Sequence, residues 1–208
     1  MKTTAGIILC GGRSRRMGKD KPTLPFGNET LIERTIGVLA QCLSPLIVVA
    51  HENQLLPEFS ENVRVMHDEL PDKGPLGGLL TGLSELKKIS PATEKAFVSS
   101  CDAPFLKKEF ILELVSHSQG YEIAVPYDGK YHHSLSAVYH SRLVDKIRQL
   151  IENDRLRPLF LFEESETNQV SCEDLKRVDP ELDSLMNTNK PEEYEFALKK
   201  AGFLKQDN

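Results

Sequence analysis

The sequence predicts a single α/β domain with a mostly parallel β-sheet and helices on both of its faces. Short, uninterrupted apolar runs, which are typical of strands buried on both faces, alternate with segments whose apolar residues recur at helical spacing. The chain has 208 residues, of which 39% are hydrophobic, so it can bury one substantial core. No internal repeat or composition break divides it. We therefore expect one three-layer domain over 1–208.

The N-terminal half alternates strands and helices in a regular order. The apolar run at 5–10 predicts the first strand. Thr30 and Glu33 have the spacing of a capping box, which predicts the start of a helix, and Pro45 marks its limit. Further strands are expected at 46–50, 63–66 and 95–100, and a helix with leucines along one face is expected around 76–86.

The C-terminal half continues this pattern less regularly. Helices are expected at 107–117, 141–152 and 191–201, and strands at 122–126, 134–138 and near 175–178. Within 153–169, the RPLFLF run indicates a short helix. The whole order of elements still favours one sheet covered by helices.

Charge and composition exclude several classes of protein. A net charge of −5 argues against general nucleic-acid binding, which requires a basic surface. No apolar run has the length of a membrane span, and the N-terminus lacks the pattern of a signal peptide. The four cysteines have no metal-binding spacing, which favours reduced thiols. We expect a cytoplasmic protein that binds neither nucleic acid nor membrane.

A glycine- and arginine-rich loop at 11–21 directly follows the first predicted strand. Gly11 and Gly12 allow a close approach of the backbone to a ligand, and their N–H groups can bind phosphate oxygens. Five cations then fall within nine positions: Arg13, Arg15, Arg16, Lys19 and Lys21. The alternative is an ordinary solvated basic loop, but its place after a buried strand favours triphosphate binding. The spacing fits neither a P-loop nor a dinucleotide fingerprint.

Two acidic residues follow other predicted strands. Because the carboxyl ends of parallel strands share one edge of a sheet, the motifs at 11–21, 67–78 and 101–104 are expected to form one site. Asp102 predicts a Mg²⁺ ligand opposite the cationic loop, although an aspartate at a strand end also commonly forms a turn. Asp68 is either a turn residue or a further residue of this site.

The stretch LCGGRSRRMGKDK at 9–21 resembles the signature of sugar-nucleotide and cofactor nucleotidyltransferases, and in detail that of the molybdenum cofactor guanylyltransferases. The resemblance extends from residue 5 to about 198 and includes the CDAP and NTN motifs in the family's order. It implies a Rossmann-like nucleotidyltransferase fold of the GT-A type. The N-terminal half would bind the nucleotide and the C-terminal half the acceptor.

The resemblance and the positions of the motifs together predict the nucleotide side of the site. The residues expected to bind nucleotide are Leu9, Cys10, Gly11, Gly12, Lys21, Asp68, Gly77 and Asp102. Gly77 and Gly78 would admit a purine ring close to the backbone. Asp102 would hold Mg²⁺, and the expected catalytic residues are Arg16, Lys21 and Asp102.

The acceptor side is predicted from the second half of the chain. Asn187 and Asn189 either cap the last helix or, by the resemblance, point into the site, although Lys190 stands where threonine is common in the family. His132 would line the pterin side of the cleft, unless it is structural together with His133. Arg155, like its neighbour Arg157, would bind an acceptor phosphate or lie in solvent.

The resemblance implies transfer of GMP from GTP to molybdenum-bound molybdopterin, with in-line attack on the α-phosphorus and release of pyrophosphate. Molybdoenzymes or cofactor-biosynthesis proteins would be transient partners. Residue chemistry alone leaves open a related transferase that uses CTP, or another nucleotide and another phosphorylated acceptor. It also leaves open a nucleotide-binding module that delivers the cofactor without turnover.

Overall fold

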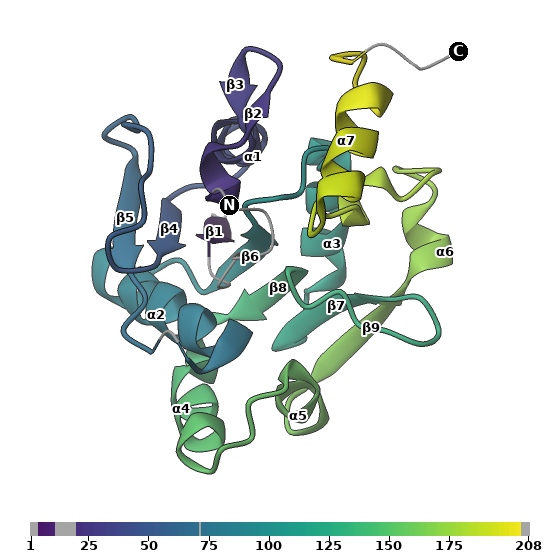
Figure 1. The fold of residues 1–208 in the computed structure, drawn as a ribbon. Coiled ribbons are helices and arrows are strands. Elements are labelled where there is room, and N and C mark those ends of the chain that lie inside the picture. Colours follow the sequence, from purple (N-terminus) through teal and green to yellow (C-terminus); the bar gives the residue numbers. More distant parts are fainter. Residues whose placement is uncertain (1–3, 11–19, 71, 205–208) are drawn as a thin grey trace.

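The computed structural model describes residues 4–10, 20–70 and 72–204, and its centre is one seven-stranded sheet (Figure 1). The strand order is β5-β4-β1-β6-β8-β7-β9. β8 pairs antiparallel with β6 and with β7, and the other pairings in this sheet are parallel. The predicted mostly parallel sheet is therefore confirmed.

The strands of this sheet are β1 (Thr4–Leu9), β4 (Leu46–Ala50), β5 (Val63–His67), β6 (Lys95–Ser100), β7 (Ile123–Tyr127), β8 (Ser136–His140) and β9 (Thr167–Ser171). A small hairpin consists of β2 (Pro25–Phe26) and β3 (Glu29–Thr30). The α-helices are α1 (Leu31–Leu39), α2 (Gly74–Ile89), α3 (Lys108–His117), α4 (Val144–Glu152), α5 (Pro158–Glu163), α6 (Cys172–Leu175) and α7 (Pro191–Lys200). Short 3₁₀ turns are η1 (Lys21–Thr23), η2 (Ser141–Leu143) and η3 (Asp183–Leu185).

Helices cover both faces of the sheet because the side chains of each strand alternate between them. On β1, Ile7 and Leu9 join a core formed with α2 and α4, whereas Ile8 joins a second core formed with α1 and α3. Figure 1 shows these two helix layers on opposite sides of the sheet. The apolar run of β1 is continuous because both of its faces are buried.

The predicted start of α1 is confirmed in atomic detail. The Glu33 amide donates to Thr30 Oγ1 at 3.4 Å, and Glu33 Oε2 accepts from the Thr30 amide at 2.7 Å. This reciprocal pair satisfies two amides at the helix start that have no partner within the helix. The helix itself ends at Leu39, some residues before the proline that was expected to limit it.

The predicted strand near 175–178 is wrong. Leu175 ends the short helix α6, and the strand of this region is β9, which begins inside the segment 153–169, where only a short helix is predicted. β9 lies at the edge of the sheet and buries Val170, whereas most of its other side chains are polar. Such a strand carries no apolar run, so its pairing with β7 rather than its sequence identifies it. The short helix predicted from RPLFLF is confirmed as α5.

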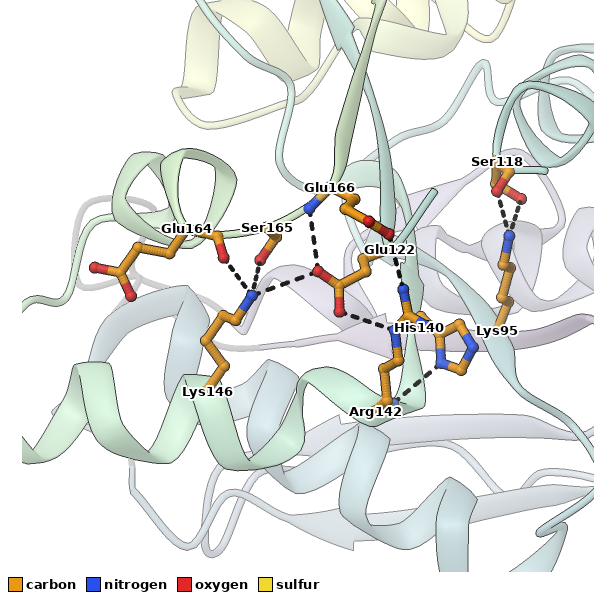
Figure 2. A network of polar contacts seen from close by, with 9 residues as sticks. All are labelled: Lys95, Ser118, Glu122, His140, Arg142, Lys146, Glu164, Ser165 and Glu166. Carbon is orange, nitrogen blue, oxygen red and sulfur yellow. Dashed lines mark hydrogen bonds and ion pairs between the residues drawn. The ribbon is translucent and has the colours of Figure 1, made fainter. Parts of the chain in front are cut away.

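The sheet has two functionally different edges. Parallel β5, β4, β1 and β6 end at the same edge, so the segments that follow them lie along it. At the opposite edge, where β6, β7 and β9 begin, a network of polar contacts centres on Glu122 (Figure 2). Arg142 Nε donates to Glu122 Oε1 at 2.8 Å, and Lys146 Nζ lies 3.4 Å from Glu122 Oε2.

In the part of the chain that the structure describes, no helix is long and apolar enough to cross a bilayer.

We expect Glu122→Gln to lower stability in a pH-dependent way. Burial raises the pKa of the Glu122 carboxyl, but the Glu166 amide, Arg142 and Lys146 more than offset this, so its pKa lies below the ordinary value of 4.5. A lowered folded-state pKa stabilises the fold above pH 4.5, and this stabilisation is lost as the pH falls through the folded-state value. The glutamine variant is expected to lose about 1 kcal/mol at pH 7 and less at pH 3.

Urea unfolding at the two pH values measures this difference. Glu166→Gln provides a matched control, because that side chain is 70% exposed and its ion pair with Arg142 contributes little. A Glu122→Gln effect of the same size at pH 7 and pH 3 would contradict the assignment.

Candidate active site

Three predicted site residues from distant parts of the chain meet at the carboxyl edge of the sheet. Lys21 Nζ lies 2.8 Å from Asp102 Oδ2 and 2.9 Å from Asn189 Oδ1. The side chain of Asp102 is 5% exposed and that of Lys21 is 18% exposed. Lys21 opens η1, Asp102 follows β6, and Asn189 precedes α7. The structure thus joins the end of the cationic loop to the carboxylate that was predicted to bind metal.

Thr188 fixes the Asn-Thr-Asn segment against the strand end. This residue is fully buried, and its amide donates to the Asp102 carbonyl at 3.0 Å. Ser100 Oγ donates to Asn187 Oδ1 at 3.3 Å, so the two asparagines bind partners at β6 and at Lys21 respectively. Sequence reasoning did not identify Thr188 or Ser100. For Thr188, the available signal in the sequence was a small residue suited to burial between two polar asparagines.

The start of α7 is capped by a glutamate rather than by an asparagine side chain. Glu193 Oε2 accepts from the Asn189 amide at 2.7 Å and from the Lys190 amide at 3.2 Å. The Asn189 side chain is thereby free to bind Lys21. Lys190, the departure from the usual family pattern, leaves this cap intact because only its backbone takes part.

Part of the predicted nucleotide side lies along the same edge. Leu9 and Cys10 are buried at the end of β1, and the Cys10 carbonyl accepts from Gln54 Nε2 at 3.4 Å. Asp68 extends the β5 ladder, and its Oδ1 accepts from the Leu70 amide at 2.9 Å. That bond is a turn-forming one, as the alternative interpretation of Asp68 expected.

Asp68 and Asp102 are well separated along this edge. β4 and β1 lie between β5 and β6, which puts the two strand ends roughly 14 Å apart at the usual strand spacing. An elongated ligand that bridges them would cross the end of β1, where the loop at 11–21 begins. Gly11, Gly12 and Arg16, like the other cations of that loop up to Lys19, lie outside the described residues.

Gly77 has a packing role of its own on α2. A Cβ atom at this position would lie 2.4 Å from the Leu70 carbonyl oxygen, so only glycine lets the helix approach this loop. At Gly78 the corresponding neighbour is the Leu9 side chain, at 3.3 Å. Contact of Gly77 with a nucleotide stays a prediction.

His132 lies on the hairpin between β7 and β8. Its ring stacks on Tyr127 with 4.7 Å between centroids. Its Nε2 atom is buried and, among the described residues, has no hydrogen-bond partner. Burial lowers the pKa of His132, which favours the neutral imidazole at pH 7. Because β7 runs parallel to β6, this hairpin lies at the same edge as Asp102.

Arg155 is engaged within the protein. Its guanidinium forms an ion pair with Glu164 and lies 4.4 Å from the centroid of the Phe160 ring. The loop that carries it contacts the start of α2, since Lys73 Nζ lies 3.4 Å from Asp154 Oδ1. An acceptor phosphate at Arg155 would therefore compete with Glu164.

The donor atoms at the centre of the site suit a hard divalent cation. Asp102 Oδ2 and Asn189 Oδ1 point to one position, and both are oxygen ligands of the kind that Mg²⁺ prefers. Over the residues that the structure describes, no three His, Cys, Asp or Glu side chains gather into a closed metal site. This fits an ion that is held by one carboxylate and completed by substrate phosphates.

Comparison with known proteins identifies relatives of this chain. Residues 6–168 match the family model described as the MobA-like NTP transferase domain. A probable molybdenum cofactor guanylyltransferase of Mycobacterium avium (strain 104) is 36% identical over 189 residues, which cover 89% of this chain and 90% of that protein. One from Mycobacterium bovis (strain BCG / Pasteur 1173P2) is 40% identical over 151 residues, with 71% and 73% covered.

A solved structure shares the fold over nearly the whole chain. Molybdopterin-guanine dinucleotide biosynthesis protein A from Archaeoglobus fulgidus superposes with a TM-score of 0.80 at 21% identity, covering 97% of this chain and 100% of that one. The nucleotidyltransferase fold and the resemblance that residues 9–21 predicted are both confirmed. The chain belongs to the family of MobA-like NTP transferase domains.

Proposed function

We propose that this protein transfers GMP from GTP to the phosphate of molybdenum-bound molybdopterin, which releases pyrophosphate and forms the guanine dinucleotide cofactor. The observation that carries the proposal is the cation–carboxylate pair of Lys21 and Asp102 at the carboxyl ends of the strands. The relatives named as guanylyltransferases, which match over most of the chain, support GTP as the donor and molybdopterin as the acceptor.

The nucleotide would lie across the edge from β5 to β6. Asp68 and Gly77 would contact the nucleoside, and the end of β1 with Leu9, Cys10, Gly11 and Gly12 would bind the phosphates. The strand order supports this orientation, because the β1 end lies between Asp68 and Asp102. The N-terminal half of the chain thus supplies the nucleotide side.

The reaction is an in-line displacement at the α-phosphorus. An oxygen of the acceptor phosphate forms the new bond to the α-phosphorus, the bond to the bridging oxygen of the β-phosphate breaks, and pyrophosphate leaves with that electron pair. Lys21 and Arg16 offset the negative charge that develops on the phosphate oxygens. The acceptor phosphate is already ionised at neutral pH, so the reaction requires no strong general base.

Asp102 and Asn189 would hold the metal, which we propose to be Mg²⁺. When bound, it supplies Lewis-acid neutralisation of phosphate oxygens. The acceptor would enter from the C-terminal half of the chain. Asn187, His132 and Arg155 would line its path at or near the edge of the sheet that carries Asp102. The unpartnered Nε2 of His132 supports a contact with a polar group of the acceptor. Molybdoenzymes or proteins of cofactor biosynthesis would receive the product by transient contact.

Calorimetric titration with GTP, CTP and ATP in the presence of Mg²⁺ tests the donor. We expect GTP to bind at least tenfold more tightly than the other two. Pyrophosphate release on addition of the molybdopterin acceptor then tests turnover. A clear preference for CTP would refute the guanylyl assignment, and nucleotide binding without pyrophosphate release would favour a non-catalytic carrier.

A further inference from the structure

The ammonium group of Lys21 occupies a position that two oxygen atoms define. Asp102 Oδ2 lies 2.8 Å away and Asn189 Oδ1 lies 2.9 Å away, and both atoms belong to segments fixed by other contacts. Thr188 binds the Asp102 carbonyl, and Glu193 holds the Asn189 amide. The two oxygens therefore form a rigid cation site, and the cation in it belongs to a flexible four-carbon side chain.

The geometry points to an exchange of cations at this position. Without nucleotide, Lys21 occupies the metal position between Asp102 and Asn189; with nucleotide, Lys21 moves to the phosphates and the two oxygens become the protein ligands of the metal. The assignment of both oxygens to the metal belongs to the proposed function, and the step added here is the movement of Lys21. This inference rests on the proposed function, because it takes the metal and the phosphates from that reaction.

Charge and space make the two cations exclusive. The Asp102 carboxylate is 5% exposed and its Oδ2 atom lies 2.8 Å from the Lys21 ammonium, so a divalent ion that binds this oxygen has to displace the ammonium. Asp102 and Asn189 bring one negative charge, which the ammonium already neutralises. A metal ion that entered beside Lys21 would meet a like charge at contact distance in a poorly solvated place.

Binding of the nucleotide phosphates removes the obstacle that the Lys21 ammonium presents to the metal. Triphosphate oxygens offer Lys21 strong charge-assisted bonds, and they add negative charge next to the vacated oxygens. Nucleotide and metal should therefore bind with positive coupling, and by linkage each raises the affinity for the other. A Lys21–Asp102 pair with a purely structural role predicts no such coupling through Lys21.

Binding of Mn²⁺ alone, measured by calorimetry without nucleotide or acceptor, tests the exchange. We expect Lys21→Met and Lys21→Gln to bind Mn²⁺ at least tenfold more tightly than the unmodified protein, because each removes the resident cation. Lys21→Arg, which keeps the charge, should stay within threefold of the unmodified protein. Adding Asp102→Asn to Lys21→Met should abolish the gain, and adding Asn189→Ala should reduce it at least threefold.

Lys176→Met is the matched control for charge. It removes the same unit charge from an exposed pair with Glu173 and should change Mn²⁺ affinity by less than twofold. Circular dichroism confirms folding of each variant, and the two neutral replacements of Lys21 guard against one that fails to fold. Folded Lys21→Met or Lys21→Gln with unmodified Mn²⁺ affinity would overturn the exchange.

The outcome of this experiment is independent of the outcome of the test of the proposed function. It contains no nucleotide and no acceptor, so a preference for CTP would leave the expected Mn²⁺ affinities unchanged. Conversely, GMP transfer together with unchanged Mn²⁺ affinity in the Lys21 variants would retain the enzyme and remove the exchange.

Discussion

Replacing Asp102 with asparagine is expected to lower turnover by about 10²–10³-fold, the range found when one preorganised electrostatic group is removed from an active site. Asparagine keeps the shape of the side chain but loses the charge that a divalent ion requires. The Asp102 carbonyl still accepts from Thr188, so the Asn-Thr-Asn segment should stay in place. The loss should therefore reflect chemistry and not unfolding.

Pyrophosphate release with GTP, Mg²⁺ and acceptor measures this effect, and a thermal melt verifies the fold. Asp145→Asn makes the same chemical change in an exposed ion pair with Arg148 and should leave turnover within twofold. Activity of Asp102→Asn within threefold of the unmodified protein would remove this carboxylate from the mechanism.

Lys21→Ala is expected to lower kcat by tenfold or more. The ammonium stabilises charge that develops as the bond to pyrophosphate breaks, so its removal acts on the transition state more than on ground-state binding. Lys21→Arg keeps the charge, but its planar fork does not reproduce the compact point charge that an ammonium group places on a phosphate oxygen. It should recover part of the lost activity.

Steady-state kinetics at saturating Mg²⁺ separate the two contributions to this loss. A fall in kcat and in kcat/KM together indicates an interaction made in the transition state, whereas a rise in KM alone indicates uniform binding. The second outcome would make Lys21 a binding residue and exclude the charge-stabilising role.

Local sequence patterns predicted much of the fold because they report local physics. The capping box at Thr30 and Glu33 specifies a helix start wherever it is placed, and the apolar run of β1 requires burial on both faces. β9 could not be found in this way, because an edge strand of mostly polar residues is defined by its hydrogen bonds to β7.

The same distinction between local sequence patterns and long-range contacts applies to the candidate site. The sequence predicted that Lys21 and Asp102 share one edge of the sheet, since the alternation of strands and helices implies parallel strands whose carboxyl ends lie together. The resemblance placed Asn189 in the site, but its contact with Lys21 and its support by Thr188 and Glu193 are seen only in the folded structure. The Lys21–Asn189 and Thr188–Asp102 contacts link positions far apart in the chain, and a local sequence pattern does not record such hydrogen bonds.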